Sequence, residues 1–243
     1  PLTAGGHRPS NTLGRLGLDV RLVTTRPGPR DGLDPGAPIV ETGISKTWKS
    51  RVDRFGRSFR DGEPLARSLR RLLDNVPVWR EVHRQARAWR PDVLYERYAL
   101  TAVAGSLIAR RLGIPHIVEV NAPLADEEER FRGLRLARLT RWCERRVLRR
   151  AHRVVVVSSA LEAHALRLGV SPERILVLPN AVDDTLFRPG RDGSGIREAL
   201  GIHGKFVVGF SGALRPWHGL DHLLEAFHTF ASERPDAVLL ILG

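Results

Sequence analysis

Four short apolar runs, each of strand length, constrain the fold of this chain more than any other feature. They are HIVEV, VVVVSSAL, KFVVGF and AVLLILG, and each is too short to cross a membrane as a helix. Segments with the three- and four-residue apolar spacing of helices lie between the runs. Strands that alternate with helices are typical of parallel βαβ units with helices on both faces of a sheet. The sequence therefore predicts an α/β fold.

The predicted strands fall into two groups that a change of composition separates. Residues 181–202 contain AVDDTLFRPGRDGSG, whose Pro, Gly and Asp suit an interdomain linker. We expect a first, Rossmann-like domain over residues 1–180 and the first βαβ unit of a second over residues 203–243. The strands of the first domain are predicted at Leu18–Thr25, Asp92–Arg97, 113–120 (GIPHIVEV), 153–159 (RVVVVSS) and Arg174–Asn180.

Helices are predicted between these strands. Basic and polar helical material runs up to Arg90, and a helix follows from about Leu100 to Leu112. A single long helix is predicted for Asp126–Arg150, with an apolar face that includes Leu136, Leu139, Cys143, Val147 and Leu148. Further helices are expected through Leu168 and up to Leu200.

The formal net charge of +12 raises two alternatives for a partner. Lysine occurs only at Lys46, Lys49 and Lys205, so arginine supplies nearly all of the 39 basic residues. The arginines are densest in Arg51–Arg71 and Arg130–Arg150. Solvated helix faces and contact with an anionic membrane or a phosphate-rich substrate both remain open there. The sequence lacks a recognised nucleic-acid motif and aromatics interleaved on a basic face, which argues against a nucleic-acid partner. A cytoplasmic protein, with or without peripheral contact at the inner membrane face, is the expectation.

No sequence pattern predicts a metal centre or a familiar nucleophile. The single cysteine, Cys143, excludes a disulfide within the chain and any site built from several cysteines. The patterns GxxxxGK[ST], HExxH and GxSxG do not occur. We therefore expect no metal and no cofactor.

The segment FSGALRPWHGLDHLLEAF reads as a strand end, a Gly/Pro loop and an amphipathic helix. Gly212 ends the strand and Gly219 begins the helix. A helix N-terminus attracts phosphate, and Arg215 and His218 could add donors. A plain surface turn, with Trp217 packed beneath it, is an equally good interpretation.

Polar residues also follow the strands of the first domain. In parallel sheets, ligands bind beyond the carboxyl ends of the strands. Glu119, Asn121, Arg97 and Ser158 lie at such ends and are candidate contacts. The alternatives are structural, because Asn-Ala-Pro suits a turn and Ser158 suits a helix N-cap. Gly5 and Gly6 would let a backbone approach a ligand, or mark a flexible terminus.

Several ordered blocks together resemble the GT-B-fold glycosyltransferases of family 4. The family's linker is matched by VLPNAVDDTLFRP, and its phosphate loop with the following helix is matched by GFSGALRPWHGLDHLLEAF. Its amino-terminal domain is matched, in order, by RLGLDVRLVTT, GIPHIVEVNAPL and HRVVVVSSALEAHALRLGVSPERILVLPN. The resemblance implies two Rossmann-like domains that face a cleft. The amino-terminal domain would mostly bind the acceptor, and the carboxyl-terminal domain would bind the donor. It further implies transfer of a sugar from a nucleotide-diphosphate donor with retention of configuration and without an essential metal.

The resemblance also assigns residues, with departures. Gly5, Gly6, Gly212, Arg215, His218 and Gly219 correspond to the donor-diphosphate site. The family's arginine falls on Ala213 and its lysine on His218, so Arg215 is the candidate replacement. The family's histidine near the reacting sugar falls on Asn121, the candidate catalytic residue, and Glu119, Arg97 and Ser158 are candidate contacts to sugar or acceptor.

The resemblance leaves the extent and activity of the protein open. The strand expected before Gly5 and the family's later pair of glutamates are absent, so we expect a fragment at both ends that is inactive alone. The partners expected are a nucleotide-sugar donor and a sugar, lipid-linked or small-molecule acceptor. Two alternatives remain, a nucleotide-sugar-binding protein without catalysis and an arginine-rich nucleic-acid-binding module.

Overall fold

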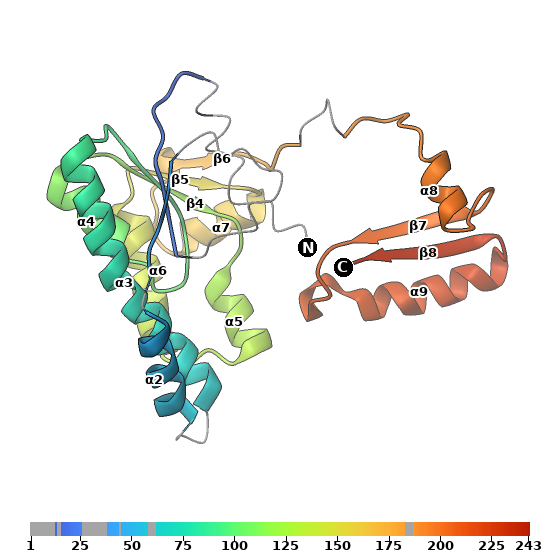
Figure 1. The fold of residues 1–243 in the computed structure, drawn as a ribbon, viewed down its shortest axis with the longest axis horizontal. Helices are drawn as coiled ribbons and strands as arrows, with labels where there is room; N and C mark the ends of the chain where they lie inside the picture. Colours follow the sequence, from blue (N-terminus) through green and yellow to red (C-terminus); the bar gives the residue numbers. More distant parts are fainter. Residues whose placement is uncertain (1–12, 14–15, 26–37, 44, 58–61, 183–186) are drawn as a thin grey trace. The chain divides into compact units, whose positions relative to one another are not determined.

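The computed structural model describes residues 13, 16–25, 38–43, 45–57, 62–182 and 187–243 (Figure 1). The chain divides into two compact units at the junction of Asn180 and Ala181. In both units, every strand pair that the structure describes is parallel. The chain is thus an α/β protein, as the sequence predicts.

The sheet of the first unit has four parallel strands in the order β3-β4-β5-β6. They are β3 (Leu94–Arg97), β4 (His116–Val120), β5 (Arg153–Val156) and β6 (Ile175–Val177). Each strand is shorter than its predicted range, because the flanking residues form the turns into and out of the sheet. A separate parallel pair is formed by β1 (Leu22–Thr24) and β2 (Ile39–Glu41). The sequence did not predict β2, which is only three residues long.

The core lies on one face of the four-stranded sheet. Val118 and Val120 of β4 pair in register with Val154 and Val156 of β5, and all four side chains are buried. Two helices, α6 (Ala137–Arg150) and α7 (Ser159–Arg167), cover this face with the buried side chains of Val147, Leu148, Leu161 and Ala165. Such alternation of buried and outward-facing residues follows from the two-residue repeat of a strand.

Helices α2 (Lys46–Arg57) and α3 (Gly62–Trp89) pack against each other and are joined by an ion pair between Asp53 and Arg70 at 2.8 Å. Asn75 of α3 fixes the start of α4 (Ala104–Leu112). Its Oδ1 accepts hydrogen bonds from the amides of Val103 and Ala104, at 2.8 and 3.1 Å. Helix α4 thus begins later than the predicted Leu100, because Thr101 has a positive φ of 60° that ends any helix there.

The prediction of one helix over Asp126–Arg150 is wrong. The structure has two helices, α5 (Leu124–Arg132) and α6, separated by Gly133 with φ 69° and Leu136 with φ 58°. The break is tied to α3, since Ser68 donates a hydrogen bond to the carbonyl of Arg135 at 3.1 Å. Consequently Leu136 and Leu139 are exposed, and Thr140 and Glu144 occupy the buried face beside Cys143, Val147 and Leu148.

Helix α5 is held to α3 by a buried carboxylate. Glu128 is only 5% exposed, and it pairs with Arg67 at 3.0 Å and Arg71 at 3.1 Å. Burial alone would raise the pKa of Glu128, but the hydrogen bonds from Arg71 and Arg67 outweigh it, so the pKa lies below its ordinary value. The carboxylate is therefore charged at neutral pH and anchors the first turns beyond β4.

The second unit is a single βαβ element with a short helix before it. Its parts are α8 (Ser194–Ala199), β7 (Phe206–Ser211), the 3₁₀ turn η2 (Pro216–His218), α9 (Leu220–Glu233) and β8 (Ala237–Leu242). Figure 1 shows α9 running along the β7–β8 pair. Leu220, Leu223 and Phe227 are half-buried there, whereas Leu224 is exposed.

No helix in the described ranges combines the length and the apolar character needed to cross a bilayer.

Candidate functional site

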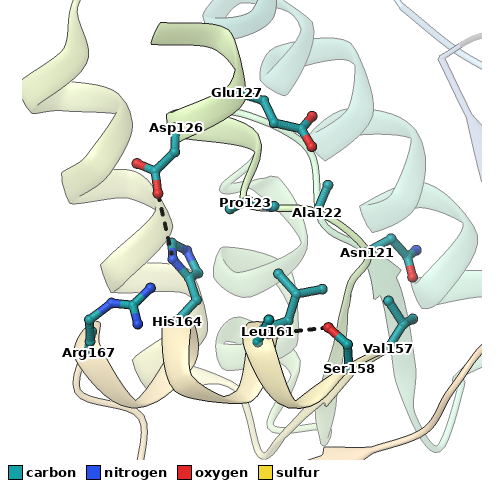
Figure 2. A pocket seen from close by; sticks show the side chains of 11 residues that line it. Asn121, Ala122, Pro123, Asp126, Glu127, Val157, Ser158, Leu161, His164 and Arg167 are labelled. Carbon is teal, nitrogen blue, oxygen red and sulfur yellow. Dashed lines mark hydrogen bonds and ion pairs between the residues drawn. The ribbon is translucent and has the colours of Figure 1, made fainter. Parts of the chain in front are cut away.

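A pocket of about 400 Å³ opens beyond the carboxyl ends of β4 and β5 (Figure 2). Its walls are the turn after β4, the first turn of α5, the end of β5 and one side of α7. The lining residues are Asn121, Ala122, Pro123, Asp126, Glu127, Val157, Ser158, Ala160, Leu161, His164 and Arg167. Of the candidate residues from the sequence, Asn121 and Ser158 line this pocket, and Glu119 and Arg97 do not.

Asn121 is oriented by the carboxylate two residues before it. Its Nδ2 donates a hydrogen bond to Glu119 Oε1 at 2.5 Å, while Tyr95 donates its hydroxyl to the other oxygen, Oε2. Burial is the larger cause that raises the pKa of Tyr95 above its ordinary value of 10.0, and the hydrogen bond to Glu119 is the second. Glu119 thus acts behind the pocket wall, as an acceptor that fixes Tyr95 and Asn121.

The amide oxygen of Asn121 is left over by this arrangement. A carboxylate can only accept, so the Asn121 nitrogen must face Glu119 and Oδ1 must point elsewhere. Oδ1 is buried and has no hydrogen-bond partner in the described part of the chain. A buried polar atom without a partner carries a desolvation cost of about 1–3 kcal/mol, which a ligand's donor would relieve. The wall of the pocket therefore contains one side-chain acceptor, Asn121 Oδ1, that is buried and unpaired.

A pair of ionisable groups lies at one side of the pocket, where His164 lines the wall and the buried Glu144 lies behind it. His164 Nε2 lies 3.2 Å from Glu144 Oε1, and Glu144 is only 1% exposed. The other ring nitrogen, Nδ1, lies 3.9 Å from Asp126 across the pocket wall, as the dashed line in Figure 2 shows. The imidazole is therefore held between carboxylates from α6 and α5. In the same figure the guanidinium of Arg167, another lining residue, lies beside it.

Ser158 has a structural role that the sequence left open. It is the N-cap of α7, and its hydroxyl accepts a hydrogen bond from the Leu161 amide at 3.4 Å. Ser158 also lines the pocket, so its position is compatible with both interpretations, the helix N-cap and the ligand contact. The pocket as a whole combines acceptors (Asn121, Asp126, Glu127) with donors (His164, Arg167), a mixture that suits a ligand rich in hydroxyl groups.

The loop Gly212–Gly219 in the second unit is organised around the carbonyl of Ala213. That oxygen accepts the amide of Arg215 at 2.8 Å and Nδ1–H of His218 at 2.5 Å. His218 therefore keeps its proton on Nδ1 toward the backbone, and Nε2 is the nitrogen left for other contacts. Gly212 adopts φ 158° and its amide bonds to the carbonyl of Leu242, which continues the β7–β8 pairing.

The loop ends at a helix N-terminus without a capping side chain. Gly219, with φ 65°, is the N-cap of α9, and no side chain accepts from the first amides. The Arg215 guanidinium lies 6.0 Å from the centre of the Trp217 ring and is exposed. An uncapped helix start with a nearby guanidinium is suited to an anion.

Gly5 and Gly6 lie outside the described residues. Arg97 ends β3 in register with Glu119 and is exposed. The residues that sequence reasoning missed are His164 and Arg167 on α7, Asp126 and Glu127 on α5, and Glu144 behind them. The signal for Glu144 was a carboxylate within the apolar face of α6. Among the described residues, no group of three or more His, Cys, Asp or Glu side chains is arranged to hold a metal ion.

Comparison with known proteins identifies the family. The model of the glycosyl transferase 4-like domain matches residues 10–181, which is most of the chain. The chain belongs to the glycosyl transferase 4-like family.

Its fold is also similar to solved glycosyltransferase structures. Anabaena HepE in complex with UDP-glucose matches 98% of the chain and 57% of its own length with a TM-score of 0.68 at 18% identity. A glycosyltransferase from Rickettsia africae matches the whole chain and 66% of its own length with a TM-score of 0.62 at 12% identity. The GT-B-type, Rossmann-like fold expected from the sequence is confirmed.

The curated relatives of this glycosyl transferase 4-like chain have different substrates in their names. An α-maltose-1-phosphate synthase from Mycolicibacterium smegmatis is 30% identical over 61% of the chain. A D-inositol 3-phosphate glycosyltransferase from Segniliparus rotundus is 30% identical over 64% of the chain. An MMP α-(1→4)-mannosyltransferase from Mycolicibacterium hassiacum is 26% identical over 96% of the chain. The matches span 39%, 35% and 58% of these relatives' own lengths.

Proposed function

We propose that this chain belongs to a retaining glycosyltransferase that takes a sugar from a nucleotide-diphosphate donor. The observation that carries the proposal is the loop Gly212–Gly219, which leads into the uncapped N-terminus of α9 with Arg215 and His218 beside it. Membership of the glycosyl transferase 4-like family supports it. A relative in fold, HepE, is described in complex with UDP-glucose, which makes uridine diphosphate a rational first probe.

The donor diphosphate would lie at the start of α9. The first amides of a helix carry partial positive charge and can stabilise the leaving diphosphate without a metal ion. Arg215 adds a full charge, and His218 Nε2 adds a hydrogen-bonding group on a ring that the Ala213 carbonyl orients. Binding without an essential metal is therefore part of the proposal.

The pocket of the first unit would receive hydroxyl groups of the acceptor or the transferred sugar. Asn121 Oδ1 is the fixed acceptor there, and Ser158, His164 and Arg167 supply further polar contacts. Asn121 cannot take up a proton, so in this proposal it orients a hydroxyl group and does not act as a general base.

Calorimetric titration of the chain tests the donor site. Uridine diphosphate should bind more tightly than uridine monophosphate, and a chelator should leave the affinity unchanged. Arg215→Ala should weaken diphosphate binding roughly tenfold, as expected for loss of a charge-assisted hydrogen bond. Arg188→Ala is the matched control, because it removes an exposed charge from the same unit outside the loop. Equal affinity for the two nucleotides, or equal effects of the two variants, would contradict the proposal.

A second candidate is nucleotide-sugar binding without transfer. It is favoured by Ala213 and Asn121, which replace the basic and titratable residues that the family resemblance leads one to expect at these positions. A radiolabelled donor separates the two: binding without release of labelled sugar to water or acceptor supports the second candidate, and turnover supports the first.

A further inference from the structure

The outer faces of α4 and α6 carry a group of exposed arginines, named here the α4–α6 surface. It consists of Arg110, Arg111, Arg138, Arg145, Arg146, Arg149 and Arg150. None of these makes an ion pair with any residue in the ranges that the structure describes. Helix α4 has no acidic residue, and the only one on α6, Glu144, is buried on the opposite side. The surface therefore has no internal counter-charge.

The charges of this surface also lie close enough to repel one another. The pKa of Arg150 is lowered, first by partial loss of solvent and then by the nearby charges of Arg146 and Arg110. Arg146 and Arg150 are one helical turn apart on α6, and Arg110 lies in the last turn of α4. Repulsion of this kind opposes folding, so the fold itself does not explain the cluster.

Neighbouring acidic groups do not neutralise it. Asp126 and Glu129 of α5 both pair with Arg141 of α6, which is not one of the seven arginines named above. Within the described residues, acidic groups thus pair with Arg141 and with none of the arginines of the surface.

Apolar side chains are set among the arginines. Trp142 is 55% exposed, and the Arg146 guanidinium lies 5.3 Å from the centre of its ring. Leu107 of α4 and Leu139 of α6 are also exposed. Tryptophan and arginine together are typical of helices that lie at the boundary between lipid headgroups and acyl chains.

We propose that the α4–α6 surface binds the anionic surface of a lipid bilayer, with its arginines on headgroup phosphates and Trp142 at the headgroup level. Charge complementarity selects an anionic partner, and the exposed tryptophan and leucines favour a surface with an apolar layer over a nucleic acid. The proposal goes beyond the transferase function, since none of these residues lines the pocket or belongs to the Gly212–Gly219 loop.

Sedimentation with vesicles tests the proposal on the 243-residue chain. It should bind vesicles of phosphatidylglycerol mixed with phosphatidylcholine, and it should not bind pure phosphatidylcholine. Arg146→Gln with Arg150→Gln should weaken partitioning roughly 30-fold, from about 1 kcal/mol for each basic residue at an anionic surface. Trp142→Ala should weaken the binding that persists at high salt, where charge attraction is screened.

A matched pair of substitutions separates binding through this surface from a general effect of net charge. Lys46→Gln with Lys49→Gln also removes two positive charges, but from α2, another basic helix, and it should change partitioning much less. Thermal melting of each variant confirms that it is folded. Equal losses for the two double variants, equal binding to neutral vesicles, or binding to duplex DNA without binding to anionic vesicles would each overturn the proposal.

Discussion

Asn121, the residue after β4, donates its side-chain amide to the carboxylate of Glu119, two residues earlier in that strand. The contact places one residue in the pocket wall and the other behind it. It follows that the orientation of Asn121, which lines the pocket, is set by a side chain that does not.

Replacing Glu119 should alter the titration of Tyr95. Glu119→Gln should lower the pKa of Tyr95, which would still lie above 10.0 because burial is the larger cause. The chain has 2 tyrosines, so a Tyr98→Phe background allows Tyr95 to be followed alone by phenolate absorbance. An unchanged titration curve would show that the Tyr95–Glu119 hydrogen bond is absent in solution.

The raised pKa of Tyr95 also predicts how stability falls in alkali. The unfolded chain releases the phenol proton near pH 10 and the folded chain retains it, so the folded state binds more protons above that pH. The free energy of unfolding should therefore decline as the pH rises above 10, and less steeply in Glu119→Gln. Urea titrations at a series of alkaline pH values measure this slope.

Removing the cap of α4 should destabilise the first unit. Asn75→Ala leaves the amides of Val103 and Ala104 and the carbonyl of Thr101 without their partner, at a cost of about 2 kcal/mol. Asn75→Asp is the control, since it keeps an acceptor for both amides and should lose less. Equal losses in chemical denaturation would contradict the capping role.

The buried carboxylate between α3 and α5 should be sensitive to substitution and to acid. Glu128→Gln should lower the free energy of unfolding by about 3 kcal/mol, because it removes the buried carboxylate that pairs with Arg67 and Arg71. The neighbouring Glu129→Gln, at an exposed surface pair, should change it by less than about 1 kcal/mol. Urea denaturation of both variants at neutral pH measures the difference.

The pKa of Glu128 lies below its ordinary value of 4.5, so its stabilisation is complete above that pH and is lost as the pH falls through the lowered value. The acid limb of the stability curve should consequently be shallower in Glu128→Gln. Parallel acid limbs in the variant and the unsubstituted chain would show that Glu128 has no lowered pKa.

A methyl group at Gly105 should disturb a contact on the core side of the sheet. An added Cβ would lie 2.1 Å from Glu96 Oε2, the oxygen that contacts Nε2 of the buried His116 at 2.9 Å. Gly105→Ala should therefore lower stability by about 1–3 kcal/mol. Gly195→Ala in α8 meets nothing within 4 Å and should be neutral or slightly stabilising. Thermal melting compares the two, and an equally stable Gly105→Ala chain would sink this explanation.

The sequence predicted most of the sheet, because apolar runs such as those around Val118 and Val155 admit few alternatives to buried strands. It also predicted that Asn121 and Ser158 follow strand ends, which brings them to the same edge. The helix break was missed because the leucine and arginine spacing continues across Gly133, and the contact of Ser68 with Arg135 is made between residues far apart in sequence.

Buried charge was the other property that the sequence concealed. Glu128 looks like a solvated helix residue, and only its packing against Arg71 shows otherwise. Glu144 lies within the apolar face of α6, but that spacing does not reveal its partner His164 on another helix. Likewise, His164 and Arg167 enter the site because α7 turns back over the strand end, an orientation that helical spacing alone does not specify.

In the described part of the chain, the buried side chains all lie between Val52 and Val170, and β7, β8 and α9 have none. Amide hydrogens of β7 and β8 should therefore exchange with solvent through openings of their own unit, long before those of β4 and β5 do. A ligand at the Gly212–Gly219 loop would slow that exchange, so deuterium uptake on β7 and β8 would report its occupancy.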